Sequence, residues 1–375
     1  MEYKAVATCA FGVEAMLKRE LIELRLSIDG ASNGRVYFRS DYAGVMRANL
    51  WLRSAEHVYL VLGEETIKSF DELFDWIKTL DIEPFVKRED AFIINAQSQK
   101  SALFSLRDIQ KITKKSLIEN LKTAFDVSVF NETNKHHDFL VYLMEDKAEF
   151  LLDTSGAPLH KRGYREQNVA APIKETLAAA IILQSFYSKE RILIDPFCGS
   201  GTIPIEAAMI GKNIAPGLNR SFAFERFKNH DSPVYKRIRK DALLAIDHET
   251  ELKIFASDVD HAAITAAQDN AFTAGVDDQI HFKTSDIRHI TTDLPYAVYI
   301  TNPPYGRRLE DEQKLEPLYR YLGQVLKKEK NASFYILSAF MGFEKTIGKR
   351  ADKTRVLFNG NIKSRLYQYF GPKPQ

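Results

Sequence analysis

The sequence predicts an α+β N-terminal half followed by an α/β C-terminal half, and two observations carry this prediction. Up to about residue 153, alternating strands are interspersed with amphipathic helices, which is typical of helices packed on one face of an antiparallel sheet. From about residue 173, apolar strands alternate with helices and the chain closes in a predicted hairpin, which favours an α/β domain.

The size and composition agree with a globular protein of several domains. A chain of 375 residues is long enough for two or three domains. Its 45% hydrophobic content indicates a packed interior rather than a disordered chain. The formal net charge is only +2, so any affinity for nucleic acid has to come from local basic surfaces.

Membrane, secreted and metal-binding classes are disfavoured. No apolar run approaches the roughly 20 residues of a membrane span. The first residues lack the basic stretch and apolar core of a signal peptide. The only cysteines, Cys9 and Cys198, are far apart and have no metal-ligand spacing. We therefore expect a cytoplasmic protein without a metal site.

The first unit is expected over residues 1–65. Asn33 and Gly34 form a turn signal before an alternating strand, and Asp41 is placed to cap a helix. The pattern predicts strands over 3–8, 35–39 and 57–62, and helices over 14–26 and from 41 to about 52.

A second unit is expected over residues 66–160, and it carries a basic helix. The pattern predicts helices over 70–80 and 106–125, and strands over 91–96, 138–143 and 147–152. The side of the second helix opposite its apolar positions is basic, and such a face attracts phosphates. The candidate RNA contacts here are Lys100, Lys111, Lys114 and Lys115. A solvated lysine face is the alternative interpretation.

Residues 161–172 are expected to form a basic linker between the two halves. Three cations, Lys161, Arg162 and Arg165, lie beside Tyr164 in a short segment. Such a cluster can grip phosphates and stack a base. The alternative is an interdomain hinge with solvated charges.

A glycine turn at residues 195–202 is the centre of the predicted site. It follows a short apolar strand over 191–194 and precedes a helix over 203–210 that has a proline near its start. Gly199 and Gly201 allow a tight turn and the close approach of a ligand, and the helix N-terminus suits an anionic group. A turn at the carboxyl end of a strand in an open α/β sheet is a ligand site by its position. The alternative is a turn that is merely tight.

A second motif, Asn302-Pro303-Pro304-Tyr305, follows the apolar strand over 297–301. The two prolines fix the backbone and remove two donors, which leaves the Asn302 side chain and the Pro303 carbonyl as acceptors. With Tyr305 as a stacking surface, this corner fits a planar group that bears an amine. Arg307, just beyond it, is a candidate for the neighbouring phosphates. A rigid turn with a packed tyrosine is the alternative.

Acidic residues follow two further predicted strands. Asp258 and Asp260 end the strand over 253–257, where an acidic group commonly binds a ribose diol. An insert over 212–251, to which the sequence assigns no role, lengthens the usual spacing. We expect Asp258 to bind the ribose and Asp260 to cap the next helix.

These motifs together resemble class I S-adenosylmethionine-dependent methyltransferases of the amino-methylating group. Enzymes acting on adenine N6, guanine N2 and the glutamine side chain share the Asn-Pro-Pro-Tyr signature, so it indicates the chemistry better than the substrate. The resemblance implies a Rossmann-like seven-stranded sheet within residues 173–375, mostly parallel with an antiparallel last strand. It also implies S-adenosylmethionine as cofactor.

The same resemblance implies roles for individual residues, with Asp286 accepting from the adenine amine of the cofactor. The residues implied to bind the cofactor are Asp195, Phe197, Cys198, Gly199, Ser200, Gly201, Thr202, Asp258, Asp286 and Asn302. Those implied to be catalytic are Asn302, Pro303, Pro304 and Tyr305.

The N-terminal half resembles the RNA-binding region of RNA-modifying enzymes. The Lys100-Ser101-x-Leu103-Phe104-Ser105 stretch, the basic helix and the closing strands resemble a THUMP domain, preceded by a ferredoxin-like α+β subdomain. The Leu159-His160-x-Arg162-Gly163-Tyr164-Arg165 linker resembles that of THUMP-linked guanine-N2 RNA methyltransferases, where it joins the two domains.

The resemblance therefore implies transfer of a methyl group to the N2 amine of a guanosine, with 23S rRNA or a ribosome-assembly intermediate as partner. Methylation of guanine N2 in tRNA, methylation of adenine N6 in DNA, and a non-catalytic RNA-binding assembly factor remain open. The sequence offers no additional target-recognition domain for DNA. The intact motif residues, Asp195 and Asn302 among them, disfavour a non-catalytic protein.

Overall fold

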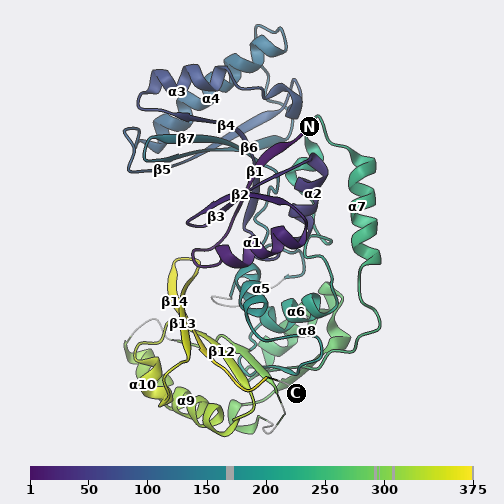
Figure 1. The fold of residues 1–375 in the computed structure, drawn as a ribbon, viewed down its shortest axis with the longest axis vertical. Coiled ribbons are helices and arrows are strands. Elements are labelled where there is room, and N and C mark those ends of the chain that lie inside the picture. Colours follow the sequence, from purple (N-terminus) through teal and green to yellow (C-terminus); the bar gives the residue numbers. More distant parts are fainter. Residues whose placement is uncertain (166–172, 291–293, 295, 306–308, 374–375) are drawn as a thin grey trace.

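Two seven-stranded sheets, one in each half of the chain, form the frame of the computed structural model (Figure 1). The structure describes residues 1–165, 173–290, 294, 296–305 and 309–373. None of the helices within these ranges is both long enough and apolar enough to cross a membrane.

The N-terminal sheet has the strand order β2-β3-β1-β4-β7-β6-β5, and only β5 and β6 pair in parallel. Its strands are β1 (Tyr3–Thr8), β2 (Ser27–Ser32), β3 (Arg35–Ser40), β4 (His57–Thr66), β5 (Ala91–Gln99), β6 (His136–Met144) and β7 (Lys147–Asp153). Its helices are α1 (Glu14–Glu23), α2 (Tyr42–Trp51), α3 (Phe70–Lys78) and α4 (Leu106–Ala124). The structure adds β2, which the sequence pattern does not predict.

One face of this sheet carries the core of the N-terminal half. Residues that pair across the strands, such as Ala5 with Leu60 and Leu60 with Leu152, belong to the same buried cluster as apolar residues of all four helices. The opposite face carries a small separate cluster around Val6, Leu140 and Leu151. Since β4 pairs with both β1 and β7, one sheet runs through both predicted N-terminal units.

The C-terminal sheet has the order β10-β9-β8-β11-β12-β14-β13. Its strands are β8 (Leu193–Asp195), β9 (Ile254–Asp258), β10 (Ile280–Thr284), β11 (Val298–Thr301), β12 (Ser333–Ser338), β13 (Lys353–Asn359) and β14 (Ile362–Tyr369). The helices are α5 (Glu175–Gln184), α6 (Thr202–Gly211), α7 (Ser232–Leu244), α8 (His261–Ala274), α9 (Leu309–Lys328) and α10 (Phe343–Ile347).

Helices cover both faces of this second sheet. Apolar residues of α5, α6 and α8 pack on one face, and those of α9 and α10 pack on the other. The strands from β10 to β12 are parallel, whereas β14 is antiparallel to both of its neighbours. The predicted mostly parallel seven-stranded sheet with a closing hairpin is thus confirmed.

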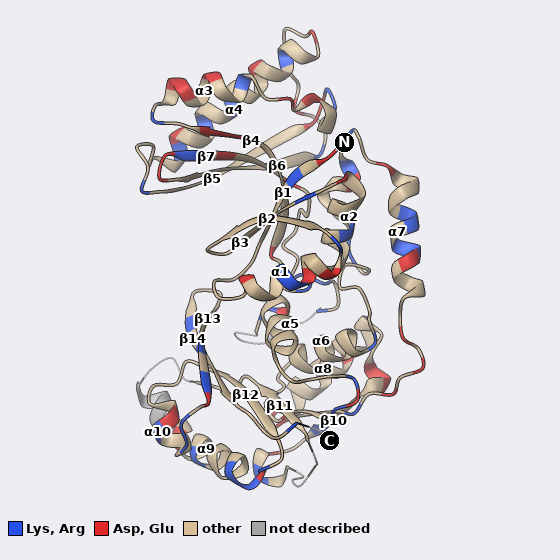
Figure 2. Ribbon diagram, in the orientation of Figure 1, with Lys and Arg blue, Asp and Glu red and all other residues tan. Residues whose placement is uncertain are grey.

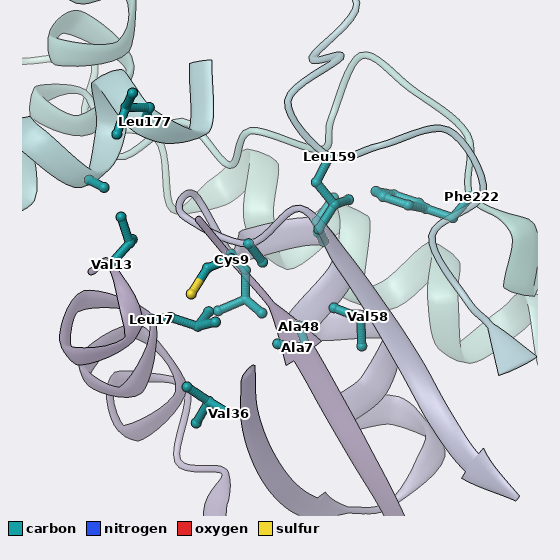
Figure 3. Packing of buried hydrophobic residues seen from close by; sticks show 14 of the residues in the cluster. Ala7, Cys9, Val13, Leu17, Val36, Ala48, Val58, Leu159, Leu177 and Phe222 are labelled. Atoms are coloured by element: carbon teal, nitrogen blue, oxygen red, sulfur yellow. The ribbon is translucent and has the colours of Figure 1, made fainter. Parts of the chain in front are cut away.

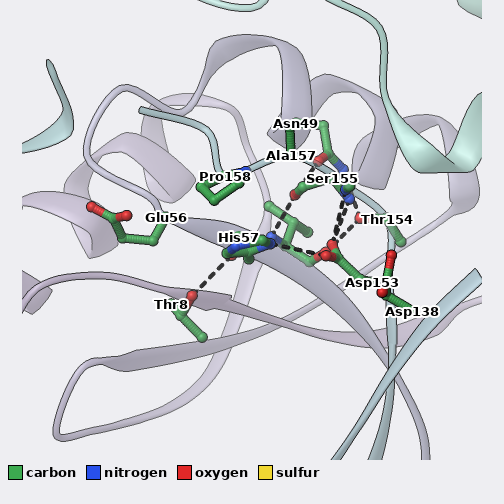
Figure 4. A network of polar contacts seen from close by, with 12 residues as sticks. Thr8, Asn49, Glu56, His57, Asp138, Asp153, Thr154, Ser155, Ala157 and Pro158 are labelled. Atoms are coloured by element: carbon green, nitrogen blue, oxygen red, sulfur yellow. Dashed lines mark hydrogen bonds and ion pairs between the residues drawn. The ribbon is translucent and has the colours of Figure 1, made fainter. Parts of the chain in front are cut away.

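Buried polar groups fix the end of the N-terminal sheet (Figure 4). The Asp153 carboxylate accepts from the backbone N–H of Ser155 at 2.8 Å and lies 2.9 Å from His57 Nδ1. Asn49 on α2 donates to Thr154 Oγ1 at 2.8 Å and accepts from Ser155 Oγ at 2.6 Å. The turn after β7 is therefore held against the first unit.

The insert over 212–251 ties the two halves together. Its Arg220 donates to the backbone carbonyls of Pro158 and Lys161, at 2.7 and 3.0 Å, and its Phe224 N–H donates to the Thr154 carbonyl at 3.1 Å. The helix α7 then packs against α2 (Figure 1). Residues from both halves share one apolar cluster, in which Figure 3 shows Phe222 of the insert and Leu177 of α5.

Candidate active site

A cavity of about 430 Å³ lies where β8, β9, β10 and β11 end. Its volume falls within the ~300–1,000 Å³ range of small-molecule sites. The predicted residues that line it are Asp195, Phe197, Cys198, Gly199, Ser200, Thr202, Asp258, Asp286, Asn302, Pro303, Pro304 and Tyr305. The structure therefore brings the glycine turn, both acidic strand ends and the double-proline corner to one place.

Gly199 provides room for a ligand in this cavity. It adopts a φ of +52°, a region that glycine tolerates best, and a Cβ added to it would meet no atom within 4 Å. Its N–H donates to Asp258 Oδ2 at 2.9 Å, which joins the turn to the end of β9. A bound molecule can thus approach the backbone here without steric conflict.

Gly201 lies between two residues that line the cavity, Ser200 and Thr202, and it also has a role in the fold. Its φ is +84°, and an added Cβ would lie 3.0 Å from the Ala267 Cβ on α8. Glycine is needed there because α6 and α8 approach closely, and the direct cofactor contact implied for Gly201 stays a prediction.

Among the carboxyl groups that line the cavity, Asp195 has the pKa that is shifted furthest from its usual value. Its Oδ1 accepts from Thr301 Oγ1 at 2.6 Å and from the Phe197 N–H at 3.2 Å. Its Oδ2 is buried and has no hydrogen-bond partner among the described residues. Burial, only partly offset by the Thr301 hydrogen bond, raises the pKa of Asp195 to about 7. A cationic ligand in the cavity would favour the ionised form.

The two acidic residues after β9 have different roles. The side chain of Asp260 accepts from the Ala262 N–H at 2.9 Å and caps α8, as the sequence predicts. Asp258 lines the cavity and holds both the Gly199 and Asp260 N–H groups. Its role on a ribose stays a prediction.

Asp286 lines the cavity after β10 and is held by Arg288. The Arg288 guanidinium donates to both carboxylate oxygens, at 3.0 and 2.8 Å, and with its backbone N–H it holds the pKa of Asp286 down at about 2. The carboxylate is therefore ionised and can accept a further hydrogen bond, as its implied role on adenine requires.

The corner after β11 presents an unsatisfied acceptor. Asn302 Oδ1 is buried and finds no hydrogen-bond partner in the described part of the chain. A buried unpaired amide oxygen is costly, so its presence in a cavity points to a ligand donor. The sequence-predicted amine site at Asn302 and Tyr305 thus has an acceptor ready to receive an N–H.

Tyr319, a residue that the sequence analysis missed, supports this corner. It is fully buried on α9, its hydroxyl lies 2.9 Å from the Pro304 carbonyl and 2.8 Å from Ser338 Oγ, and its ring stacks on Phe340 at 4.3 Å. Amphipathic spacing could have marked Tyr319 as a core residue of α9. Nothing local indicates that it reaches the double-proline turn.

The side chains of the predicted RNA-binding lysines have mixed surroundings. Lys100 pairs with Glu145 at 3.0 Å, and Lys114 pairs with Glu132 at 2.9 Å. Lys115 lies over the Phe74 ring, while Lys111 and Lys161 are exposed. Arg307 lies outside the described residues. RNA contact by these residues stays a prediction.

The prediction that Arg162 contacts RNA is wrong. Its side chain is 2% exposed and forms an ion pair with the fully buried Glu206 of α6 at 3.3 Å, beside the hydroxyl of Tyr164. Arg165 is also turned inward, since it donates to Thr202 Oγ1 and pairs with Glu175 at 3.2 Å. The RNA role expected for Arg165 fails for the same reason, and these linker cations join the two halves instead.

The sheet order, the glycine turn and the acidic strand ends together define a class I S-adenosylmethionine-dependent methyltransferase. Comparison with family models identifies three consecutive regions: an RlmL ferredoxin-like domain at residues 4–59, a THUMP domain at 68–153, and an RMKL-like methyltransferase domain at 162–368. The chain belongs to this RMKL-like methyltransferase family.

Two relatives of known sequence differ in their length. "Putative RNA methyltransferase YpsC" of Bacillus subtilis is 39% identical, and the match covers 100% of this chain and 98% of that protein. "Ribosomal RNA large subunit methyltransferase K/L" of Shewanella baltica is 32% identical over 94% of this chain. The match spans only 50% of that longer protein.

Three solved structures share the whole fold. "A possible methylase" from Clostridium difficile 630 is 42% identical, with a TM-score of 0.96 and 100% of both chains covered. "A predicted N6-adenine-specific DNA methylase" from Listeria monocytogenes is 40% identical, with a TM-score of 0.94 and 99% and 97% covered. SMU.472, "a putative methyltransferase complexed with SAH", is 39% identical, with a TM-score of 0.93 and 100% and 99% covered.

Asp195 predicts a pH dependence of cofactor binding. With a pKa near 7 in the free protein, its carboxyl is largely protonated at pH 6, and ionisation as the pH rises favours the cationic sulfonium. We expect S-adenosylmethionine to bind about tenfold more weakly at pH 6 than at pH 8, with proton release at pH 6. Calorimetric titration in two buffers measures both effects. An equal pH dependence in Asp195→Asn would contradict this assignment.

The buried pair predicts a large stability effect at Arg162. Arg162→Met leaves Glu206 as an uncompensated buried charge and should lower the free energy of unfolding by about 3–5 kcal/mol. Arg162→Met with Glu206→Leu should recover part of that loss. Lys161→Met, on the exposed neighbour, is the control and should change little. Urea titration followed by circular dichroism measures these values. If Arg162→Met alone is as stable as the control, the pair does not contribute to the free energy of unfolding.

Proposed function

We propose that the protein transfers a methyl group from S-adenosylmethionine to the exocyclic N2 amine of a guanosine in RNA, with 23S rRNA as the substrate. The observation that carries the proposal is the unpaired amide oxygen of Asn302 in the cofactor-sized cavity. The THUMP match and the names of the relatives support RNA, and the K/L relative is named for large-subunit rRNA.

In this reaction the residues of the protein would position the target amine rather than act as general acids or bases. S-adenosylmethionine supplies an activated methyl group. Asn302 Oδ1 and the Pro303 carbonyl would accept the two hydrogens of the target amine and turn its lone pair away from the ring. Positioning of this kind can contribute ~7–11 kcal/mol.

The surrounding residues would complete the grip on the base. Tyr305 offers a ring for stacking, and Tyr319 holds the Pro304 carbonyl in place. A base in a helix has to leave its stack to reach this cavity, at a cost of a few kcal/mol. Cys198 lines the cavity, where burial raises the pKa of its thiol and keeps it neutral, so it can meet the cofactor only as an uncharged group.

The proposed division of labour follows the predicted boundaries. Residues 1–65 and 66–160 would bind RNA, 161–172 would connect the halves, and 173–375 would carry out the transfer. The matched family ranges support this arrangement.

A second candidate is methylation of adenine N6 in DNA, because the similar protein from Listeria monocytogenes is described as "a predicted N6-adenine-specific DNA methylase". The same corner accepts either exocyclic amine, so the choice depends on the N-terminal half, where the THUMP match favours RNA.

Substrate assays separate these candidates. Tritiated S-adenosylmethionine is supplied with unmodified 23S rRNA, tRNA and DNA, and the labelled nucleoside is identified by chromatography. We expect N2-methylguanosine from 23S rRNA. Label confined to tRNA, or recovered as N6-methyladenine from DNA, would overturn the proposal.

Asn302→Ala tests the amine clamp. The variant should lose methyl transfer while its dissociation constant for S-adenosylmethionine changes by no more than about twofold, because the lost acceptor faces the substrate. Parallel measurement of transfer and of cofactor binding checks this. Loss of both to the same extent would place Asn302 in cofactor binding alone.

Tyr319→Phe tests the support behind the corner. The variant loses the contact with Ser338 Oγ as well as the hydrogen bond to the Pro304 carbonyl. Loss of the bond to the corner, at ~0.5–1.5 kcal/mol, should slow transfer about 3- to 10-fold with unchanged cofactor affinity. Tyr369→Phe is the matched control, since Tyr369 is equally buried and its hydroxyl donates to the Lys349 carbonyl at 3.1 Å. Equal slowing in both variants would indicate a general packing effect.

A further inference from the structure

The helix α7 carries exposed cations that form no ion pair with a described residue. Lys236, Arg237 and Lys240 are all exposed, and no ion pair of these side chains occurs within the described ranges. Figure 2 shows the basic residues along this outer helix. The contrast with Arg162, Arg165, Lys100 and Lys114 is direct, because each of those cations is paired with a carboxylate.

A notch of about 330 Å³ lies between α7 and α2. Arg237 of α7 and Arg47 of α2 line it, and neither has an ion-pair partner in the part of the chain that the structure describes. Trp51, at the end of α2, provides a partly exposed indole in the same notch. Asp241 is the acidic residue of the lining.

This combination fits one nucleotide of an RNA strand. Two guanidinium groups suit phosphate, since arginine binds phosphate oxygens in a forked geometry. An indole suits a base, because every base has a face that can stack. Asp241 offers an acceptor for a ribose 2′-hydroxyl, which is the group that distinguishes RNA from DNA.

We propose that the α2–α7 notch is an RNA-binding site, in which Arg47 and Arg237 hold phosphate and Trp51 stacks a base. This inference rests on the proposed RNA substrate and adds the surface that binds it. It gives a role to the insert, whose α7 supplies half of the site. A folded protein partner would need a larger complementary surface than this small charged notch provides.

The test is the binding of an unmodified 23S rRNA transcript over a series of salt concentrations. Arg47→Gln with Arg237→Gln should weaken binding about tenfold or more and reduce the salt slope by about 1.4, the value for two phosphate contacts on a single strand. Lys18→Gln with Lys345→Gln is the control, since it removes two exposed cations on α1 and α10. The control should leave both quantities nearly unchanged.

Trp51→Leu separates stacking from charge. It should weaken binding about fivefold or more without altering the salt slope, because no phosphate contact is lost. Unchanged cofactor affinity and melting temperature confirm that each variant is folded. If Trp51→Leu does not fold, the arginine pair still decides, because those side chains are not core residues.

Two outcomes overturn the inference. If the arginine variant binds RNA with the affinity and salt slope of the wild type, the notch is not an RNA-binding site. Methyl transfer to 23S rRNA by the same protein would still support the proposed function. Equal weakening by the control variant would reduce the notch to a nonspecific charge effect. A wild-type protein that neither binds nor methylates RNA would instead refute the proposed function.

Discussion

The buried carboxylate of Glu206 is the point on which the two halves of the molecule depend. It sits on α6, directly behind the glycine turn, and receives both the guanidinium of Arg162 and the hydroxyl of Tyr164. Burying two opposite charges costs desolvation energy, which is offset only when the charges pair closely and their remaining polar groups form hydrogen bonds. Arg162 meets that condition by donating also to the Leu159 and Arg53 carbonyls, so the linker and the first unit are fixed to α6.

Glu206 lies about one turn of α6 away from the cavity. Thr202, the first residue of α6, lines the cavity and accepts a hydrogen bond from Arg165. The linker therefore contacts both the start and the middle of the helix that shapes the glycine turn. A movement of the N-terminal half would therefore disturb the glycine turn unless these polar contacts broke first.

The parts of the site that the sequence predicted are those that short segments determine. The glycine turn, the cap at Asp260 and the double-proline corner each follow from backbone rules that act over a few residues. The cations at Arg162 and Arg165 were misjudged because a charge pattern does not reveal a carboxylate 44 residues further along, as Glu206 is from Arg162.

The same limit explains what the sequence did not predict. The edge strand β2 is largely exposed and lacks the alternation that marks a half-buried strand. Tyr319 is like other core aromatics in its spacing, and its contact with Pro304 exists only after α9 has packed against β12. The alternating strands and helices of the second half, by contrast, are a repeated signal that identified the fold.

The continuous sheet of the N-terminal half has a further consequence. Because β4 of the first predicted unit pairs with β7 of the second, the two units cannot hinge against each other without breaking that strand pair. The buried pair of Arg162 and Glu206 joins this half to α6, so α4 is held at a set distance from the cavity. A nucleic acid that contacts both α4 and the cavity would have to span that distance. The protein would then select its target by the separation between the contacted segment and the target base in the folded strand.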